Sequence, residues 1–167
     1  MCADQKTPHT PAVQDYYPDD VAHCYGCGRL NEHGHQLRTR WDGNETVTKF
    51  RPHPYHTAIP GSVYGGLVAS LIDCHGTGTA AAVAARAEGV ELGGDLVPSG
   101  QAPRFVTAAL TVQYLRPTPL GPEIEVRGRV KESSDRKVVV EATVSAEGQI
   151  TARGEVVAVR MPKGMLP

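Results

Sequence analysis

The segment that decides the fold reads Pro60-Gly61-Ser62-Val63-Tyr64-Gly65-Gly66 and runs directly into Leu67-Val68-Ala69-Ser70-Leu71-Ile72-Asp73. Its glycines are typical of a turn, and the apolar residues after them predict a long helix over about Tyr64 to Arg86. The first amides of a helix lack partners within it and carry the positive end of its dipole. This helix start could therefore hold a carbonyl oxygen that gains negative charge.

A single carboxylate, Asp73, stands two turns into the predicted helix. At about 100° per residue it falls opposite an apolar arc. That arc consists of Leu67, Val68, Leu71 and Ile72. The side of Asp73 carries small residues that would let a second chain approach, namely Ala69, Gly76, Thr77 and Ala80. Two interpretations stay open: a solvated residue of an amphipathic helix, or a functional carboxylate in a crevice or interface.

Short segments with the period-two pattern of β-strands surround this helix in the sequence. They lie at about 36–41, 45–50, 105–114, 123–131, 138–144 and 150–160. In the third segment, Val106 and the alternate residues to Tyr114 form the predicted apolar face, which leaves Thr107 off it. One helix and about six antiparallel strands predict an α+β fold in which the sheet wraps the helix. The glycine-rich residues 87–103 predict a long loop that could act as a lid.

The chain has 167 residues, which is typical of one domain. Its 17 basic and 18 acidic residues give a net charge of −1 without any block of like charge. This balance argues against a nucleic-acid or membrane partner. Residues 1–22 are polar and proline-containing, so they predict a flexible arm before a domain at 23–162, and a cytoplasmic protein is expected. The four cysteines do not form a secreted disulfide framework, so reduced thiols are expected.

Taken together, these motifs resemble the hotdog-fold acyl-CoA thioesterases, including those of phenylacetate pathways. The similarity spans about Cys24 to Val159. It depends on Cys24-Tyr25-Gly26-Cys27-Gly28, on the glycine-rich helix start with Asp73 seven residues beyond Gly66, and on Thr107 to Pro117. The resemblance implies a hotdog fold, an acyl-CoA substrate, no cofactor or metal, and a homo-oligomer that is a dimer or a dimer of dimers.

The same resemblance implies roles for particular residues. Asp73 would serve as nucleophile or general base, and the amides of Gly65 and Gly66 would polarise the thioester carbonyl. Thr107 matches a threonine that helps to position the attacking water. The active site would span two chains, with Asp73 from one and the helix-start amides from the other.

The family usually has histidine where this chain has Tyr64. A tyrosine hydroxyl can donate a hydrogen bond to substrate, but it titrates near pH 10, so packing alone is an equally open role for Tyr64. His56, in the preceding proline-rich loop, is a candidate substrate contact, although an exposed loop histidine is the simpler reading. Arg104 or Arg116 could meet the phosphates of coenzyme A or simply be surface arginines.

Three other interpretations compete with this one. The pattern His23-Cys24-x2-Cys27-x5-His33-x-His35 contains enough soft ligands for zinc, but a single Cys-x-x-Cys pair is a weak signal and the family has a similar turn without metal. A non-catalytic acyl-CoA-binding protein is the second alternative, because the family histidine is missing. A hotdog hydratase is disfavoured, because His75 projects in the wrong helical direction to pair with Asp73. The identity of the acyl group is not encoded in any of these motifs.

Overall fold

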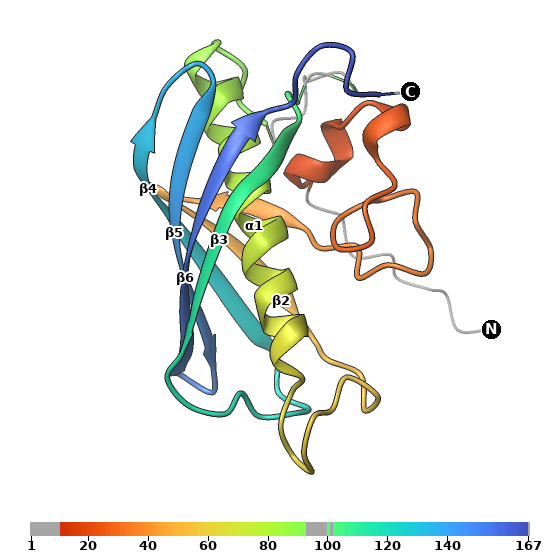
Figure 1. The fold of residues 1–167 in the computed structure, drawn as a ribbon, viewed down its shortest axis with the longest axis vertical. Coiled ribbons are helices and arrows are strands. Elements are labelled where there is room, and N and C mark those ends of the chain that lie inside the picture. Colours follow the sequence, from red (N-terminus) through yellow and green to blue (C-terminus); the bar gives the residue numbers. More distant parts are fainter. Residues whose placement is uncertain (1–10, 93–99, 101, 167) are drawn as a thin grey trace, which may run out of the picture.

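In a computed structural model, which describes residues 11–92, 100 and 102–166, one long helix lies across a single sheet (Figure 1). The helix is α1 (Gly65–Ala87). The strands are β1 (Thr39–Asp42), β2 (Glu45–Phe50), β3 (Phe105–Tyr114), β4 (Ile124–Ser133), β5 (Lys137–Ala146) and β6 (Gln149–Arg160). This is the hotdog fold, and it confirms the predicted α+β class.

The sheet has six strands in the order β1-β2-β4-β5-β6-β3, and every neighbouring pair is antiparallel. Strands β4, β5 and β6 follow one another as a meander, whereas β3 joins at the far side of β6 and forms one edge of the sheet. The strands predicted at 105–114, 123–131, 138–144 and 150–160 are therefore confirmed in type and nearly in bounds. The location of β3 at an edge could not be read from its own residues.

Helix α1 is buried on almost every side, because the sheet covers one face and the N-terminal segment covers another (Figure 1). Its length and hydropathy would suffice to cross a membrane, but 78% of its most apolar window is buried inside this domain, as expected of a core helix. Leu71 and Ile72 are fully buried, and burial of such side chains stabilises the fold by roughly 2 kcal/mol each. Ile72 also packs on Gly154 of β6.

The described part of the predicted arm, residues 11–22, is packed against the domain, so a flexible arm is wrong for these residues. Two short 3-10 helices form there, η1 (Val13–Tyr16) and η2 (Asp19–Val21). Val13 and Tyr17 are buried in the core. The buried amide of Gln14 donates to Thr39 Oγ1 at 3.0 Å and accepts from the Thr39 N–H at 2.8 Å. Residues 1–10 lie outside the described ranges, as do residues 93–99 of the predicted lid.

The small residues of α1 serve packing within the chain rather than the approach of a second copy. A Cβ on Gly76 would lie 2.5 Å from the Val156 side chain of β6, and one on Gly78 would lie 2.7 Å from Thr39 Oγ1. Ala80 is completely buried. For Gly76 and Ala80, the prediction that this helix side faces a symmetry mate is therefore wrong, because the rest of the chain already covers them. Ala69 and Asp73 are only partly buried, so for them the approach of a second copy stays a prediction.

Candidate active site

Asp73 and Thr107 meet between α1 and the edge strand β3. The Thr107 hydroxyl donates a hydrogen bond to Oδ1 of Asp73. Asp73 is half-buried and Thr107 is exposed, so the carboxylate is reachable from solvent. The predicted pairing of these two residues in one site is consistent with this contact, which joins positions far apart in the sequence.

A β-bulge in β3 directs Thr107 toward the helix. Thr107 pairs with Ala158 of β6 and Ala109 pairs with Val157, which leaves Ala108 as the extra residue. An extra residue reverses which alternate side chains face the core. Phe105 and Thr107 therefore face α1 before the bulge.

After the bulge, Val112 and Tyr114 face α1 instead: Val112 packs against the core and the Tyr114 hydroxyl donates to the Gly65 carbonyl at 2.7 Å. The sequence-based expectation that Thr107 lies off the apolar face, with Val106 and Ala108 on it, is wrong for this reason. Alternation of side chains is interrupted in this strand, because it contains a bulge.

The first N–H groups of α1 lie close to the rings of Tyr64 and Tyr114. The N–H groups of Leu67 and Val68 donate to the Tyr64 carbonyl at 3.0 and 3.3 Å, and the Tyr64 N–H donates to the His56 carbonyl at 2.8 Å. The N–H groups of Gly65 and Gly66 precede these bonds, and in the described part of the chain neither has a protein acceptor. Two donors at the positive end of the helix are thus available to an oxyanion.

The ring of Tyr64 lies against Gly66. A Cβ on Gly66 would fall 2.4 Å from ring atoms of Tyr64, so glycine is required there for this ring position. By contrast, a Cβ on Gly65 would lie 3.5 Å from the Tyr114 ring, an ordinary contact distance. Tyr64 itself is 59% exposed and provides no side-chain cap to the helix. Its hydroxyl is therefore placed at the helix start, where the family histidine was expected.

Asp73 and the helix-start amides of the same chain lie well apart along α1. Seven residues separate Gly66 from Asp73, which corresponds to about 10 Å along the helix axis. An oxyanion donor lies roughly 3 Å from the carbonyl oxygen, and a carboxylate lies roughly 3 Å from the carbonyl carbon or from the water that attacks it. This spacing favours amides from a second copy as the partners of Asp73.

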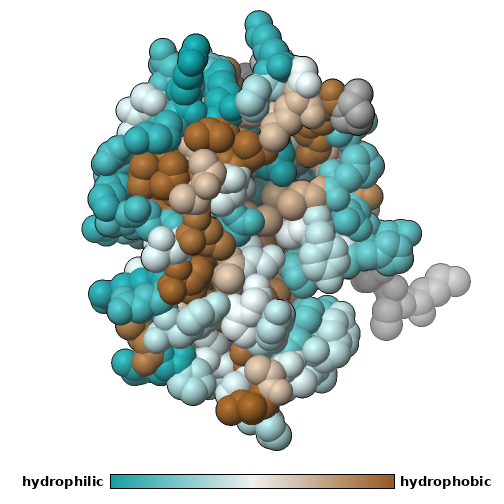
Figure 2. Space-filling model, in the orientation of Figure 1, coloured by the Kyte–Doolittle hydropathy of each residue, from teal (hydrophilic) through white to brown (hydrophobic). Residues whose placement is uncertain are grey.

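Strand β3 offers an apolar edge for such a copy. Its free edge is unpaired within the described residues. Large apolar side chains are exposed along it and beside it, namely Leu110, Tyr114, Leu115 and Tyr64. Figure 2 shows hydrophobic surface on the side of the molecule where Figure 1 draws β3. Exposed strand edges with apolar side chains are typical of interfaces.

The other predicted substrate contacts have partners of their own, and His56 lies beside the helix start, where its carbonyl accepts from the Tyr64 N–H. The His56 ring packs among aromatic rings, with ring centres 5.3 Å from His35 and 5.7 Å from Phe50, and its Nδ1 accepts from the His53 N–H at 3.0 Å. Burial and the neighbouring histidines lower the pKa of His56. Arg116 follows β3 and donates to Gln149 at 2.6 Å. The guanidinium carbon of Arg104 lies over the Tyr17 ring, 4.6 Å from its centre.

His75 faces away from the candidate site. Its ring is fully buried, with Nδ1 2.7 Å from the Thr48 hydroxyl and Nε2 3.1 Å from the Thr46 hydroxyl, both on β2. Burial lowers its pKa to about 3, so the ring is neutral at physiological pH. This geometry agrees with the prediction that His75 cannot partner Asp73.

The structure does not bring together the cysteines and histidines that the sequence suggested as zinc ligands. His35 belongs to the aromatic cluster around His56, and His33 is exposed beside Glu32. Cys24 and Cys27 instead approach Cys74 of α1, a residue that sequence reasoning did not connect with them. A helical cysteine separated by almost fifty residues from the Cys-x-x-Cys pair gives no spacing signal.

Comparison with known proteins gives consistent results. The model of the thioesterase superfamily matches residues 60–153. A thioesterase superfamily protein from Shewanella loihica is 49% identical, with 86% of this chain and 98% of that chain covered and a TM-score of 0.64. No curated protein matches the sequence significantly.

Two more distant solved structures share the fold. The PaaI protein of the Escherichia coli phenylacetic acid degradation operon is 15% identical, with 77% of this chain and 81% of that chain covered and a TM-score of 0.59. A Streptococcus mutans protein bound to acetyl-CoA is 16% identical, with 76% and 90% covered and a TM-score of 0.57.

Proposed function

Because the chain belongs to the thioesterase superfamily, we propose that it hydrolyses the thioester bond of an acyl-coenzyme A, with Asp73 as general base or nucleophile. The observation that carries the proposal is the contact of Asp73 with Thr107, which fixes a solvent-reachable carboxylate beside an apolar strand edge. The acetyl-CoA bound to the Streptococcus mutans relative supports the substrate class.

In the proposed mechanism, Asp73 either takes a proton from a water that attacks the thioester carbonyl and passes it to the leaving sulfur, or attacks the carbonyl directly. Direct attack forms an acyl-aspartyl anhydride, which a water then hydrolyses to release the acid, restore the carboxylate and supply the proton for the thiolate. The amides of Gly65 and Gly66 from a second copy stabilise the oxyanion, and coenzyme A leaves as the thiol after protonation of its sulfur. Thr107 holds the carboxylate in position through its hydrogen bond. The homo-oligomer is part of the proposal, because Asp73 and the helix-start amides lie about 10 Å apart along one helix.

The substitution Asp73→Asn tests the carboxylate. It preserves size and leaves an acceptor for Thr107, so folding and assembly should be retained. Hydrolysis across a panel of acyl-CoA thioesters, followed by release of free thiol, should fall by at least ~100-fold, the scale of a lost general base. Near-normal turnover of the variant would exclude Asp73 as the catalytic carboxylate.

Co-expression of two defective variants tests the shared site. Gly65→Pro removes an amide donor at the first helical position, where proline is tolerated and the Tyr64 backbone (φ −57°, ψ 126°) already suits a following proline. Gly65→Ala keeps the amide and is the matched control. Random assortment of Gly65→Pro and Asp73→Asn chains should restore about one quarter of wild-type activity, since half of the dimers hold one intact site. No recovery above the sum of the two variants would contradict a site built from two chains.

The alternative function is non-catalytic binding of acyl-CoA, which Tyr64 in place of histidine favours. In that case the unaltered protein would bind acyl-CoA and release no thiol. Calorimetric binding measured beside the hydrolysis assay separates the two functions.

A further inference from the structure

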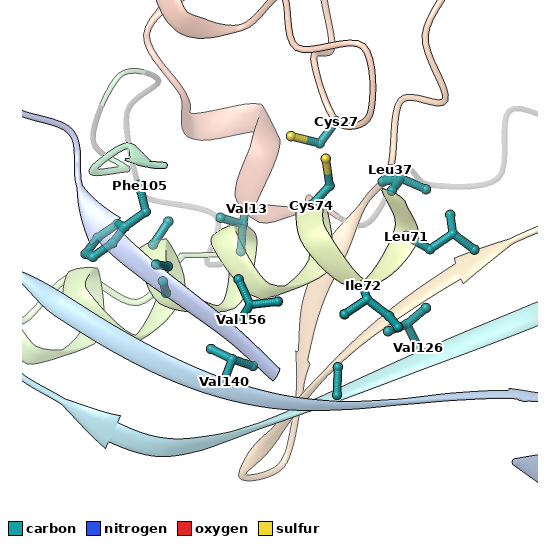
Figure 3. Packing of buried hydrophobic residues seen from close by; sticks show 14 of the residues in the cluster. Val13, Cys27, Leu37, Leu71, Ile72, Cys74, Phe105, Val126, Val140 and Val156 are labelled. Atoms are coloured by element: carbon teal, nitrogen blue, oxygen red, sulfur yellow. The ribbon is translucent and has the colours of Figure 1, made fainter. Parts of the chain in front are cut away.

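Three cysteine thiols converge outside the candidate active site. Cys24 and Cys27 lie on the loop between η2 and β1, whereas Cys74 lies on α1. All three sulfur atoms are within 4.8 Å of one another, and those of Cys24 and Cys74 are 3.9 Å apart. Figure 3 shows the side chains of Cys27 and Cys74 in the space between the loop and the helix.

The backbone allows this close approach at two glycines. A Cβ on Gly26 would lie 2.2 Å from the Cys74 sulfur, so only glycine lets the loop lie directly on the helix there. A Cβ on Gly28 would lie 2.4 Å from the Cys24 backbone nitrogen, and the Gly28 N–H donates to the Cys24 carbonyl at 2.7 Å. The Cys-x-x-Cys turn is therefore tight and held against Cys74.

Two buried donors beside the thiols lack acceptors. The hydroxyl of Tyr17, a residue that is 1% exposed, and Nη1 of Arg104 have no hydrogen-bond partner among the residues described. Nη2 of Arg104 lies 3.9 Å from the Cys27 sulfur. Neutral thiols are weak acceptors, but metal-bound thiolates are negatively charged and accept well. A buried guanidinium and a spare hydroxyl thus suit a cluster of thiolates.

We propose that Cys24, Cys27 and Cys74 together bind one Zn²⁺ ion. Zinc bonds thiolate sulfur at about 2.3 Å in a tetrahedron, which places neighbouring sulfurs about 3.8 Å apart, close to the separation of Cys24 and Cys74. Soft thiolates favour zinc over magnesium or calcium. Each thiol loses its proton on binding, so three thiolates and one Zn²⁺ carry a net charge of −1, which Arg104 balances. Cys24 is only half-buried, so a solvent-derived ligand can complete the fourth position.

The proposed zinc ties the N-terminal loop to the helical turn that carries Asp73, because Cys74 is the next residue. Its role is structural, and it stands apart from the proposed hydrolysis. A disulfide is the competing outcome. It would join two of the sulfurs at about 2.05 Å and leave the third thiol without a role.

The test uses the full-length protein without a histidine tag, purified under reducing conditions from zinc-supplemented cells. Elemental analysis by mass spectrometry should find about one zinc per chain, and X-ray absorption at the zinc edge should show about three sulfurs near 2.3 Å. Both measurements use the unaltered protein, so misfolding of a variant cannot obscure them. Less than about a tenth of a zinc per chain after incubation with excess Zn²⁺, or a zinc shell without sulfur, would overturn the proposal.

Substitutions locate the ion. Cys27→Ser and Cys74→Ser should each reduce bound zinc at least tenfold, whereas the double variant His33→Ala/His35→Ala, which removes the histidines of the sequence-derived set, should keep it. Retention of zinc by both cysteine variants, or its loss from the histidine variant alone, would refute the assignment. Loss of two free thiols in protein without zinc would identify a disulfide instead and would equally exclude the site.

Discussion

The Thr107 hydroxyl donates its hydrogen bond to the Asp73 carboxylate across the boundary between helix α1 and edge strand β3. Among the residues that the structure describes, neither side chain makes another hydrogen bond or ion pair. The side chain of Thr107 is exposed, so its hydroxyl is not needed to satisfy a buried group. The contact therefore suggests that Thr107 serves to orient the carboxylate.

For Thr107, we expect Thr107→Val to lower kcat about tenfold, the equivalent of one net hydrogen bond of ~1.4 kcal/mol. KM should change little, because the residue acts through Asp73 and not on substrate. Thr107→Ser, which keeps the hydroxyl, should recover most of the rate. Equal losses in the Val and Ser variants would show that the methyl group, rather than the hydrogen bond, is what matters.

For Tyr64, the comparison of Tyr64→Phe with Tyr64→His separates two roles. If the hydroxyl donates to substrate, the Phe variant should lose about 1 to 3 kcal/mol in transition-state binding, and the His variant should retain much of the activity. If the ring only packs on Gly66, the Phe variant should keep nearly full activity and the His variant should lose more activity than the Phe variant. Values of kcat/KM decide between the two roles. An unchanged kcat/KM for Tyr64→Phe would exclude this hydroxyl from the site.

For the assembly, light scattering should give at least twice the mass of one chain at micromolar concentration. Leu110→Lys should weaken self-association at least tenfold, because a charge would be buried at the β3 edge. Ile150→Lys is a matched control, since Ile150 and Leu110 are both 38% exposed and Ile150 lies near the β5–β6 turn. A fully active monomer would contradict the site shared between two chains.

For pH dependence, the buried His75 should make the folded protein less stable as the pH falls. Its pKa is about 3 in the folded protein and 6.5 when unfolded, so the unfolded state binds more protons between these values. The contribution of His75 to the free energy of unfolding should be constant above pH 6.5. It should fall by roughly a few kcal/mol as the pH drops toward 3. Urea unfolding at pH 7 and pH 5 measures the loss.

The variant His75→Phe has a ring that cannot take up a proton. It gives up the hydrogen bonds to Thr46 and Thr48 and should be less stable at pH 7. Its unfolding free energy should nevertheless depend less steeply on pH than that of the unaltered protein. The same pH slope in both proteins would assign the effect to other groups.

Sequence was sufficient for the parts of the fold that depend on local pattern. The glycine-rich start and the apolar run predicted α1 to within a residue or two, and alternation predicted the strands from β3 to β6 closely. The site pair Asp73 and Thr107 came from a family resemblance, because no local pattern joins residues this far apart.

The features that were missed depend on long-range packing. The burial of residues 11–22 depends on Gln14 meeting Thr39, and the thiol cluster depends on Cys74 meeting a distant loop. The face of Thr107 was predicted wrongly because a bulge is a mismatch between two strands, which one strand cannot reveal.

The extra residue Ala108 also bears on how related sequences should be compared. Deletion of this one alanine would preserve Asp73, Thr107, Tyr114 and the helix-start glycines in any alignment. It would nevertheless turn either Thr107 or Tyr114 to the opposite face of the sheet, since the two face α1 together only because of the bulge. A relative that carries every site residue but has a one-residue gap here should therefore be judged by the length of this strand, and not by the identity of its conserved positions.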